Sequence, residues 1–180
     1  LKENKIISEL NLSMTELNSM NIPGICPGLS ANKTLTHLNL SNNNIKSSGA
    51  ISILKSLYNS NIMELRMACN HITDDVSPFV SAFLSKNKKI SLLDLSVNEL
   101  GNRFMNSLVG QTALNSTLEE LILSRNPIGG RGIASFGLFL VQNQKLRILT
   151  VNGCMIEANG FIEFCNELQR NESLEFLRIQ

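Results

Sequence analysis

The stretch Leu35–Gly49 reads LTHLNLSNNNIKSSG, and its apolar residues follow neither of the two regular patterns of secondary structure. A half-buried strand alternates apolar and polar residues, and an amphipathic helix places apolar residues three or four positions apart. Here, with Leu35 as position 1, apolar residues stand at positions 4, 6 and 11, and Asn43 stands at position 9. A pattern of this kind becomes informative when it recurs along a chain.

The same pattern recurs along the whole chain at a nearly constant spacing. Successive copies begin 28, 27, 28, 28, 28 and 28 residues apart, a regularity that chance does not produce. The second half of several copies has apolar residues at helical spacing, as in residues 48–59, 130–143 and 158–171. Three copies carry glycine at position 15, where we expect the chain to turn into the helix. The copies begin at Ile7, Leu35, Ile62, Ile90, Leu118, Leu146 and Leu174.

The pattern L-x-x-L-x-L-x-x-N-x-L resembles the leucine-rich repeat, and repeats of 27–28 residues resemble its ribonuclease-inhibitor-like class. The resemblance implies an α/β fold, a right-handed leucine-rich-repeat solenoid (horseshoe) with parallel strands on the concave face and helices on the convex face. Asparagine at position 9 resembles the family's ladder, in which Cys154 replaces it once. We expect residues 1–180 to be a single leucine-rich-repeat domain of about six repeats plus partial terminal ones, a fragment of a longer solenoid.

A second asparagine stands three residues before each copy. We expect it at the helix C-terminus in the left-handed conformation, which asparagine tolerates better than other non-glycine residues. Three of the chain's five N-x-S/T sequons contain this asparagine, so the structural interpretation is favoured over glycosylation. The residues are Asn4, Asn32, Asn59, Asn87, Asn115, Asn143 and Asn171. In the first copy, Pro23 and Pro27 predict a short or irregular helix.

The composition argues against several classes of partner and location. The chain has 16 basic and 15 acidic residues, a net charge of +1, so we expect neither a nucleic-acid partner nor an anionic membrane. No apolar run approaches the ~20 residues needed to cross a bilayer. The four cysteines show no metal-binding spacing with histidine, and we expect them to be reduced thiols in a cytoplasmic protein.

The sequence contains no recognisable arrangement of catalytic or ligand-binding residues, so we expect no catalytic residue, no cofactor and no metal site. His37 and His71 have no suitable ligand or triad partner near them in sequence. The segment 126–135, NPIGGRGIAS, lies where a nucleotide-binding loop would lie, but it lacks the third small residue of a dinucleotide fingerprint and the lysine of a P-loop. Its Gly132 is an ordinary position-15 glycine of the repeat.

The variable residues between the apolar ones identify the concave surface, which is where solenoids usually bind. Positions 3, 5, 7 and 8 are mostly polar in the N-terminal copies and include several apolar residues in the C-terminal copies, Val97 among them. Exposed apolar patches commonly mark partner sites, so we expect a protein partner on the C-terminal half. The candidate partner-binding residues are Leu92, Asp94, Glu120, Ile122, Arg125, Ile148, Phe176 and Arg178.

The sequence therefore predicts a protein–protein interaction scaffold without enzymatic activity. Two alternatives remain open, because the repeat positions are structural and do not choose among families. One is a GTPase-activating protein resembling the activator of the GTPase Ran, in which Arg103, Arg125 or Arg131 would stabilise charge during phosphoryl transfer. The other is a cytoskeletal, actin-regulating repeat domain, as in tropomodulin.

Overall fold

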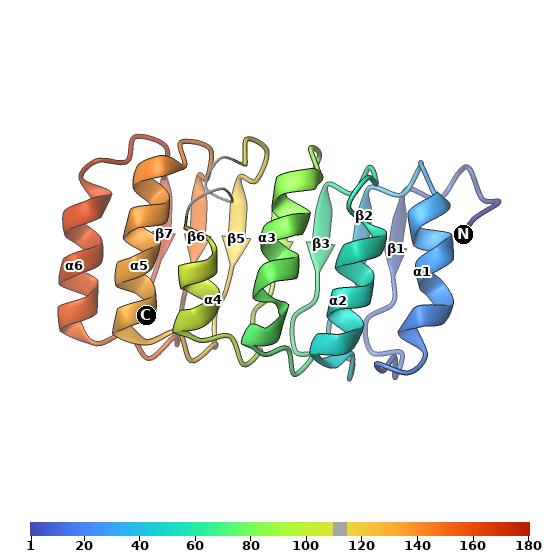
Figure 1. Cartoon of the computed structure of the whole chain (residues 1–180), viewed down its shortest axis with the longest axis horizontal. Helices are drawn as coiled ribbons and strands as arrows, with labels where there is room; N and C mark the ends of the chain where they lie inside the picture. Colours follow the sequence, from blue (N-terminus) through green and yellow to red (C-terminus); the bar gives the residue numbers. More distant parts are fainter. Residues whose placement is uncertain (110–114) are drawn as a thin grey trace.

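The computed structural model describes residues 1–109 and 115–180, and strand and helix alternate along them as the repeat predicts (Figure 1). The strands are β1 (Glu9–Asn11), β2 (His37–Asn39), β3 (Glu64–Arg66), β4 (Leu92–Asp94), β5 (Glu120–Ile122), β6 (Ile148–Thr150) and β7 (Phe176–Arg178). The helices are α1 (Ile22–Ala31), α2 (Lys46–Ser56), the 3-10 helix η1 (Asp74–Val76), α3 (Ser77–Lys86), α4 (Asn102–Ser107), α5 (Gly129–Gln142) and α6 (Ala158–Leu168).

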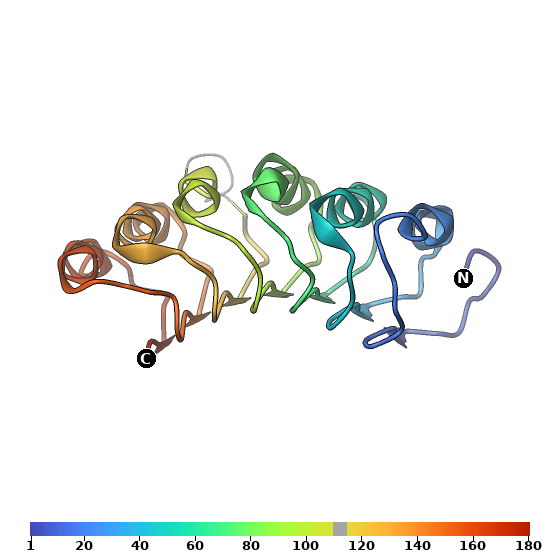
Figure 2. The same cartoon turned by 90° about the horizontal axis from the view of Figure 1, so that it is seen from below.

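The seven strands of the described residues form one parallel sheet in sequence order. Each strand pairs with the next at a register of one repeat, so that Leu38 lies opposite Leu65 and Leu65 lies opposite Leu93. The helices drawn in Figure 2 all lie on one side of the sheet, and the row of repeats bends so that the strands line the inner side of the arc. The predicted α/β solenoid, with its strands on the concave face and its helices on the convex face, is confirmed.

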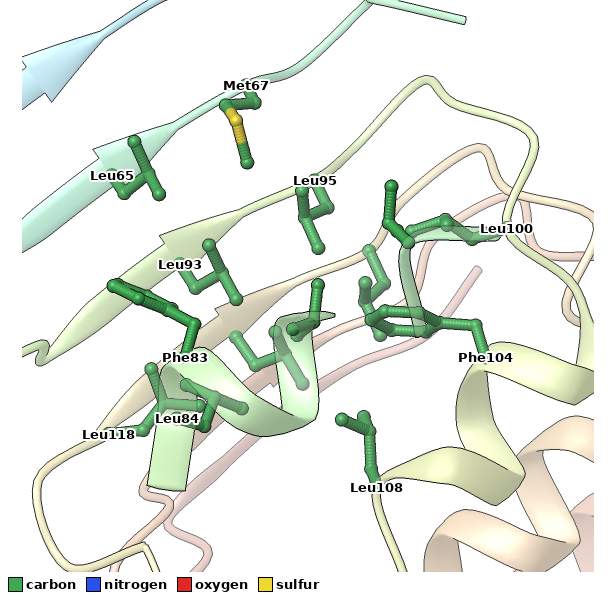
Figure 3. Packing of buried hydrophobic residues seen from close by; sticks show 14 of the residues in the cluster. Leu65, Met67, Phe83, Leu84, Leu93, Leu95, Leu100, Phe104, Leu108 and Leu118 are labelled. Carbon is green, nitrogen blue, oxygen red and sulfur yellow. The ribbon is translucent and has the colours of Figure 1, made fainter. Parts of the chain in front are cut away.

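The apolar positions of the repeat form one core between the sheet and the helices (Figure 3). In the second to sixth copies, the residues at positions 1, 4, 6 and 11 are at most 3% exposed, except Ile156. The helices contribute large side chains such as Phe83 and Phe104. Complete burial of a side chain of this size stabilises a fold by about 1.5–3 kcal/mol. The corresponding residues of β1 and β7 are only half-buried, because each of these strands has one neighbour instead of two.

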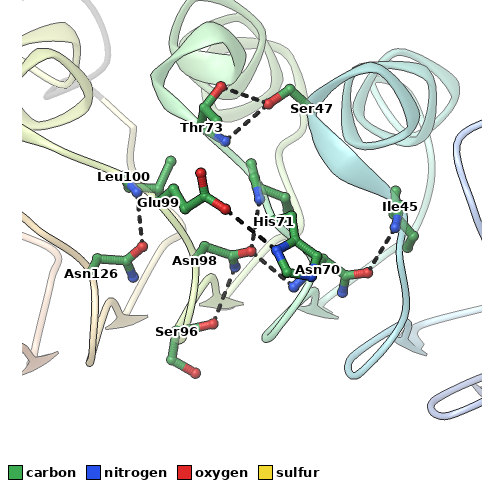
Figure 4. A network of polar contacts seen from close by, with 11 residues as sticks. Ile45, Ser47, Asn70, His71, Thr73, Ser96, Asn98, Glu99, Leu100 and Asn126 are labelled. Atoms are coloured by element: carbon green, nitrogen blue, oxygen red, sulfur yellow. Dashed lines mark hydrogen bonds and ion pairs between the residues drawn. The ribbon is translucent and has the colours of Figure 1, made fainter.

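Asparagine at position 9 connects each repeat to its neighbour through buried hydrogen bonds (Figure 4). Asn98 is representative. Its Nδ2 donates to the carbonyl oxygens of Met67 and Leu95, both at 3.0 Å, and its Oδ1 accepts from the backbone N–H groups of Asn70 and Ile72, also at 3.0 Å. At Cys154 the thiol donates to the Leu123 carbonyl oxygen at 3.2 Å, so it replaces the amide's donor role.

The second asparagine also forms hydrogen bonds between repeats, and the predicted left-handed conformation is wrong. Asn32, Asn87 and Asn143 have φ of −71°, −74° and −95°, in the extended region. Their side chains explain why they recur. The Oδ1 of Asn87 accepts from Ile90 N at 2.9 Å, and its Nδ2 donates to the Leu57 carbonyl oxygen at 3.0 Å. Because Asn32 and Asn115 are buried, a folded chain does not present these two sequons for glycosylation.

A left-handed residue recurs instead at position 8, three residues after the end of each strand. Every copy from the first to the sixth has positive φ there, between 53° and 65°. The residues are Met14, Asn42, Cys69, Val97, Arg125 and Gly153. Only two of the six are glycine or asparagine, so the local sequence does not favour the conformation. The turn is held by neighbouring repeats, as in the hydrogen bond from Val97 N to the Ser124 carbonyl oxygen at 2.7 Å.

The proline-containing helix is not short. It forms α1, an α-helix of ten residues that is as long as α3. Pro23 lies in the first turn, where a backbone N–H has no partner within the helix, and Pro27 is exposed. The shortest α-helix among the described residues is α4, with six residues, and no feature of the repeat pattern predicted this.

The position-15 glycines lie within the first turn of their helices, and each allows a close approach. A β-carbon at Gly49 would lie 3.4 Å from Ile22 Cγ1 of α1, and one at Gly132 would lie 3.3 Å from Asn102 Cα of α4. At Gly160 the contact is with the backbone of Gly130, so α5 and α6 touch at two residues that both lack a side chain. Glycine at position 15 therefore sets how closely neighbouring helices pack.

Candidate functional site: the concave surface of β4–β7

A recurring irregularity at the start of each strand determines which side chains reach the concave surface. The N–H groups of positions 2 and 3 both donate to one carbonyl oxygen, that of position 2 in the preceding repeat. Glu119 N and Glu120 N, for example, both lie 2.9 Å from the Ser91 oxygen. Two adjacent residues that share one acceptor form a bulge-like start to the strand, which interrupts the alternation of faces. The two residues between the apolar positions 1 and 4 can therefore both face outwards.

These outward residues line a hollow of about 280 Å³ along the first residues of β3–β7. The row at position 3 runs Glu64, Leu92, Glu120, Ile148 and Phe176, each paired in register with the next. The row at position 2 supplies the rest of the lining, Ser91, Glu119, Arg147 and Glu175. Apolar and charged side chains therefore lie side by side on one surface.

The structure brings together four of the eight predicted partner-binding residues, Leu92, Glu120, Ile148 and Phe176, in this hollow. Phe176 is 53% exposed, and Ile148 is half-buried. Leu92 is only 8% exposed, so the expectation that it presents an open apolar surface is wrong. Leu92 lies between β3 and β5, where the longer side chains of Glu64 and Glu120 flank it.

The other four predicted residues lie outside this hollow. Asp94 is half-buried, and its Oδ1 accepts from the N–H and the hydroxyl group of Ser96 at 2.9 and 2.7 Å, so it stabilises the end of β4. Ile122 is half-buried on β5, and Arg125 is an exposed residue in the left-handed turn after it. Arg178 lies 3.4 Å from Thr150 Oγ1 through its Nη1 atom.

Five residues that line the hollow were not among the predicted partner-binding residues: Glu64, which lies at the expected concave position 3, and the position-2 residues Ser91, Glu119, Arg147 and Glu175. A signal for the position-2 row was present. Two consecutive non-core residues separate positions 1 and 4 in every copy, and strict alternation would have placed one of them inside. Counting both as outward would have identified the whole lining of the hollow.

The charges around the hollow are unevenly paired. Arg147 forms a bidentate interaction with Glu175, with Nε–Oε1 at 2.9 Å and Nη2–Oε2 at 2.8 Å. Glu64 interacts with Arg66 at 3.2 Å and with His37 Nε2 at 3.5 Å. Among the described residues, no cationic side chain pairs with Glu119 or Glu120. The hollow therefore has an excess of negative charge at β5.

Other polar groups considered in the sequence make contacts between neighbouring repeats. His71 Nδ1 lies 3.4 Å from Glu99 Oε1 of the next repeat (Figure 4). In the nucleotide-like segment 126–135, Asn126 belongs to the position-9 ladder and Gly130 N donates to Glu157 Oε2 at 2.5 Å. Within residues 1–109 and 115–180, no three acidic, histidine or cysteine side chains converge as metal ligands.

The thiols are all unpaired. The four cysteines are free, and burial raises the pKa of the Cys26 and Cys154 thiols, which keeps them in the unreactive protonated form. No helix in the described part of the chain has the length and apolar character needed to cross a membrane.

Comparisons with known proteins agree with the repeat. Residues 31–54, 58–75 and 114–137 match the leucine-rich repeat family. The NACHT, LRR and PYD domains-containing protein 4C of Mus musculus is 30% identical over 144 residues, which cover 78% of this chain and 15% of that protein. The ribonuclease inhibitor of Mus musculus is 25% identical over 196 residues, which cover 91% of this chain and 43% of the inhibitor. The chain thus spans less than half the length of either relative.

The fold also matches solved structures. The actin-binding site 2 domain of leiomodin-1 superposes with a TM-score of 0.53 at 18% identity, over 93% of this chain and 82% of that one. At this identity the likeness concerns the fold alone. The repeat length, the asparagine ladder, the parallel sheet and the family matches lead to one conclusion: the chain belongs to the leucine-rich repeat proteins, in their ribonuclease-inhibitor-like class.

Proposed function

We propose that this chain is a non-catalytic scaffold that binds a protein partner on the concave surface of β4–β7. The observation that carries the proposal is the hollow along β3–β7, where Ile148 and Phe176 present apolar surface beside charged groups. A polar rim around a few apolar anchors is the usual composition of a protein interface. We place the interaction in the cytoplasm, and the free cysteines support that location.

The names of similar proteins support a binding role. One relative is named an inhibitor of a ribonuclease, and one solved structure with this fold is titled an actin-binding site. Solenoids of this kind have an extended concave surface whose variable side chains are free to specify a partner, while the ladder and core residues maintain the shape. We propose that the variable residues of this chain serve the same purpose without a cofactor.

The test replaces apolar residues on the two faces of the solenoid. The chain with Ile122→Asp and Ile148→Asp is compared with a control that carries Leu138→Asp and Ile162→Asp on the exposed convex side of α5 and α6. Partners captured from cell extract by the unaltered chain are identified, purified and measured against both variants by biolayer interferometry. We expect the concave variant to weaken binding at least about tenfold, as for the loss of a central interface anchor, and the convex control to leave it unchanged. Equal affinity for the concave variant and the unaltered chain would refute the proposal.

The enzymatic alternative has its own test. Arg103, Arg125 and Arg131 are exposed, and among the described residues none of them forms an ion pair. We expect the chain to leave GTP hydrolysis by a panel of small GTPases at its intrinsic rate. An acceleration that disappears when one of these arginines is replaced by alanine would contradict a non-catalytic role, because an activating arginine contributes about 10³–10⁵-fold.

A further inference from the structure

The chemistry of the hollow points to one kind of partner side chain. We propose that the hollow binds a lysine or arginine of the partner, with its cationic group at Glu119 and Glu120 and an adjacent apolar residue against Phe176. This inference rests on the proposed function and adds the chemical class of the segment that is bound.

The first argument is charge complementarity. Four carboxylates and one guanidinium line the hollow. The guanidinium of Arg147 is bound through two hydrogen bonds to Glu175, and Glu64 interacts with Arg66. Two carboxylates, those of Glu119 and Glu120, are left without a cation among the residues that the structure describes. A partner that supplies a cation would complete the pairing, whereas a phosphate or an acidic peptide would be repelled.

The second argument is the placement of apolar groups beside these carboxylates. In the position-3 row, Glu120 stands between Leu92 and Ile148. Lysine and arginine have an aliphatic stem and a charged end, and they bury the stem along apolar surface while the end reaches a polar partner. A stem that lies over Ile148 and the edge of Leu92 would bring its charged end to Glu120. Phe176, two strands further along, offers the exposed ring for a neighbouring apolar residue.

The third argument is size. Neighbouring strands of a sheet lie about 4.8 Å apart, so the row from Leu92 to Phe176 spans about 14 Å. The hollow of about 280 Å³ holds one long side chain and part of a second, and not a folded domain. Its occupant is therefore a short element of the partner, with the remaining contacts made along the rest of the concave surface.

The test uses three tripeptides as defined probes: acetyl-Phe-Arg-Leu-amide, the lysine version, and the version with citrulline, which keeps the shape of arginine without its charge. Each is titrated into the ¹⁵N-labelled chain and followed by NMR. We expect saturable shifts at the backbone amides of residues 91–92, 119–120, 147–148 and 175–176 with the arginine or lysine peptide. The citrulline peptide should bind about tenfold more weakly, because a hydrogen bond between charged groups is lost.

Matched variants test whether the two glutamates are responsible. The chain with Glu119→Gln and Glu120→Gln should bind the cationic peptide about tenfold more weakly. A control with Glu163→Gln and Glu172→Gln changes the net charge equally at exposed positions away from the hollow and should bind as the unaltered chain does. No saturable shifts, shifts centred elsewhere, or equal binding by the glutamine variant at 119 and 120 would each overturn the inference.

The two proposals fail in different ways. If an identified partner is lost on Ile122→Asp with Ile148→Asp but binds normally to the variant with Glu119→Gln and Glu120→Gln, the cation inference is wrong and the proposed function stands. If the partner binds the aspartate variant normally, the proposed function is wrong, whatever the peptides show.

Discussion

Replacement of Gly160 by alanine should destabilise the chain, although alanine is a better helix former than glycine. Gly160 lies in the first turn of α6, and a β-carbon there would overlap the Cα, carbonyl carbon and carbonyl oxygen of Gly130 in α5. Carbon atoms pack favourably at about 3.5–4.0 Å, and backbone atoms cannot rotate away as the end of a side chain can. The two helices must therefore separate.

The magnitude follows from two opposing effects. Forcing an extra methyl group into a packed contact costs about 1–3 kcal/mol, and separation of α5 from α6 also loosens the contact between Gly137 and Phe164. The change from glycine to alanine within a helix returns about 0.5–1 kcal/mol. We expect a net loss of about 1–2 kcal/mol, which lowers the Tm of a chain of this size by roughly 2–8 °C.

The assay is thermal and urea unfolding followed by circular dichroism, with Gly24→Ala as the matched control. Gly24 lies in α1, and a β-carbon there would meet nothing within 4 Å. This control should stabilise the chain by about 0.5–1 kcal/mol, because only the helix preference changes. Hydrogen exchange should show the loss in the Gly160 variant concentrated in α6 and β7, because each repeat of a solenoid is stabilised by its immediate neighbours. If both variants were stabilised alike, the contact between Gly130 and Gly160 would not limit the packing of the helices.

Three further outcomes are expected. Asn98→Ala should destabilise the chain by roughly 3–5 kcal/mol in urea unfolding, because several buried groups, such as Ile72 N and the Met67 carbonyl oxygen, would lose their hydrogen-bond partner. A loss under about 1 kcal/mol would contradict a stabilising role for the position-9 asparagines. Val97→Gly should stabilise the chain by about 0.5–1 kcal/mol, because the backbone of this β-branched residue is held at a φ of 53°, which glycine adopts freely. A lower Tm for the variant would show that the contacts of the Val97 side chain, which is 42% exposed, outweigh the backbone strain. Cys154 and Cys26, whose thiol pKa values are raised by burial, should react with a thiol reagent at neutral pH more slowly in the folded chain than in urea, and equal rates would refute their protection.

Much of the fold was predictable because the repeat is local and regular. Apolar residues at positions 1, 4, 6 and 11 recur every 27 or 28 residues, and in the second to sixth copies stacking buries all of them except Ile156 against the same positions of their neighbours. One repeat, from Leu35 to Ile62, is 27 residues long instead of 28, and in that repeat the asparagine at the helix end is not buried. Asn59 is exposed, and the adjacent Ser60 is buried and receives a hydrogen bond from Asn87 at 3.3 Å through its carbonyl oxygen.

The candidate site was only partly predictable. Glu120, Ile148 and Phe176 were identified because they lie at a variable position of a strand. Leu92 was wrongly expected to be open, because its exposure depends on the side chains of the two flanking strands. Arg147 and Glu119 were overlooked, because strict alternation of faces does not hold where two N–H groups share one carbonyl oxygen.

The sequence by itself determined the repeat, its strand and helix order, the buried positions and the absence of a recognisable catalytic motif, because each of these follows from residue type and spacing along the chain. The tertiary structure decided the left-handed turn at position 8, the pairing of Arg147 with Glu175 and the unpaired charge at Glu119 and Glu120. The reason is physical. Arg147 and Glu175 are 28 residues apart and meet only when two repeats are stacked in register, so no local pattern shows which charges remain unpaired.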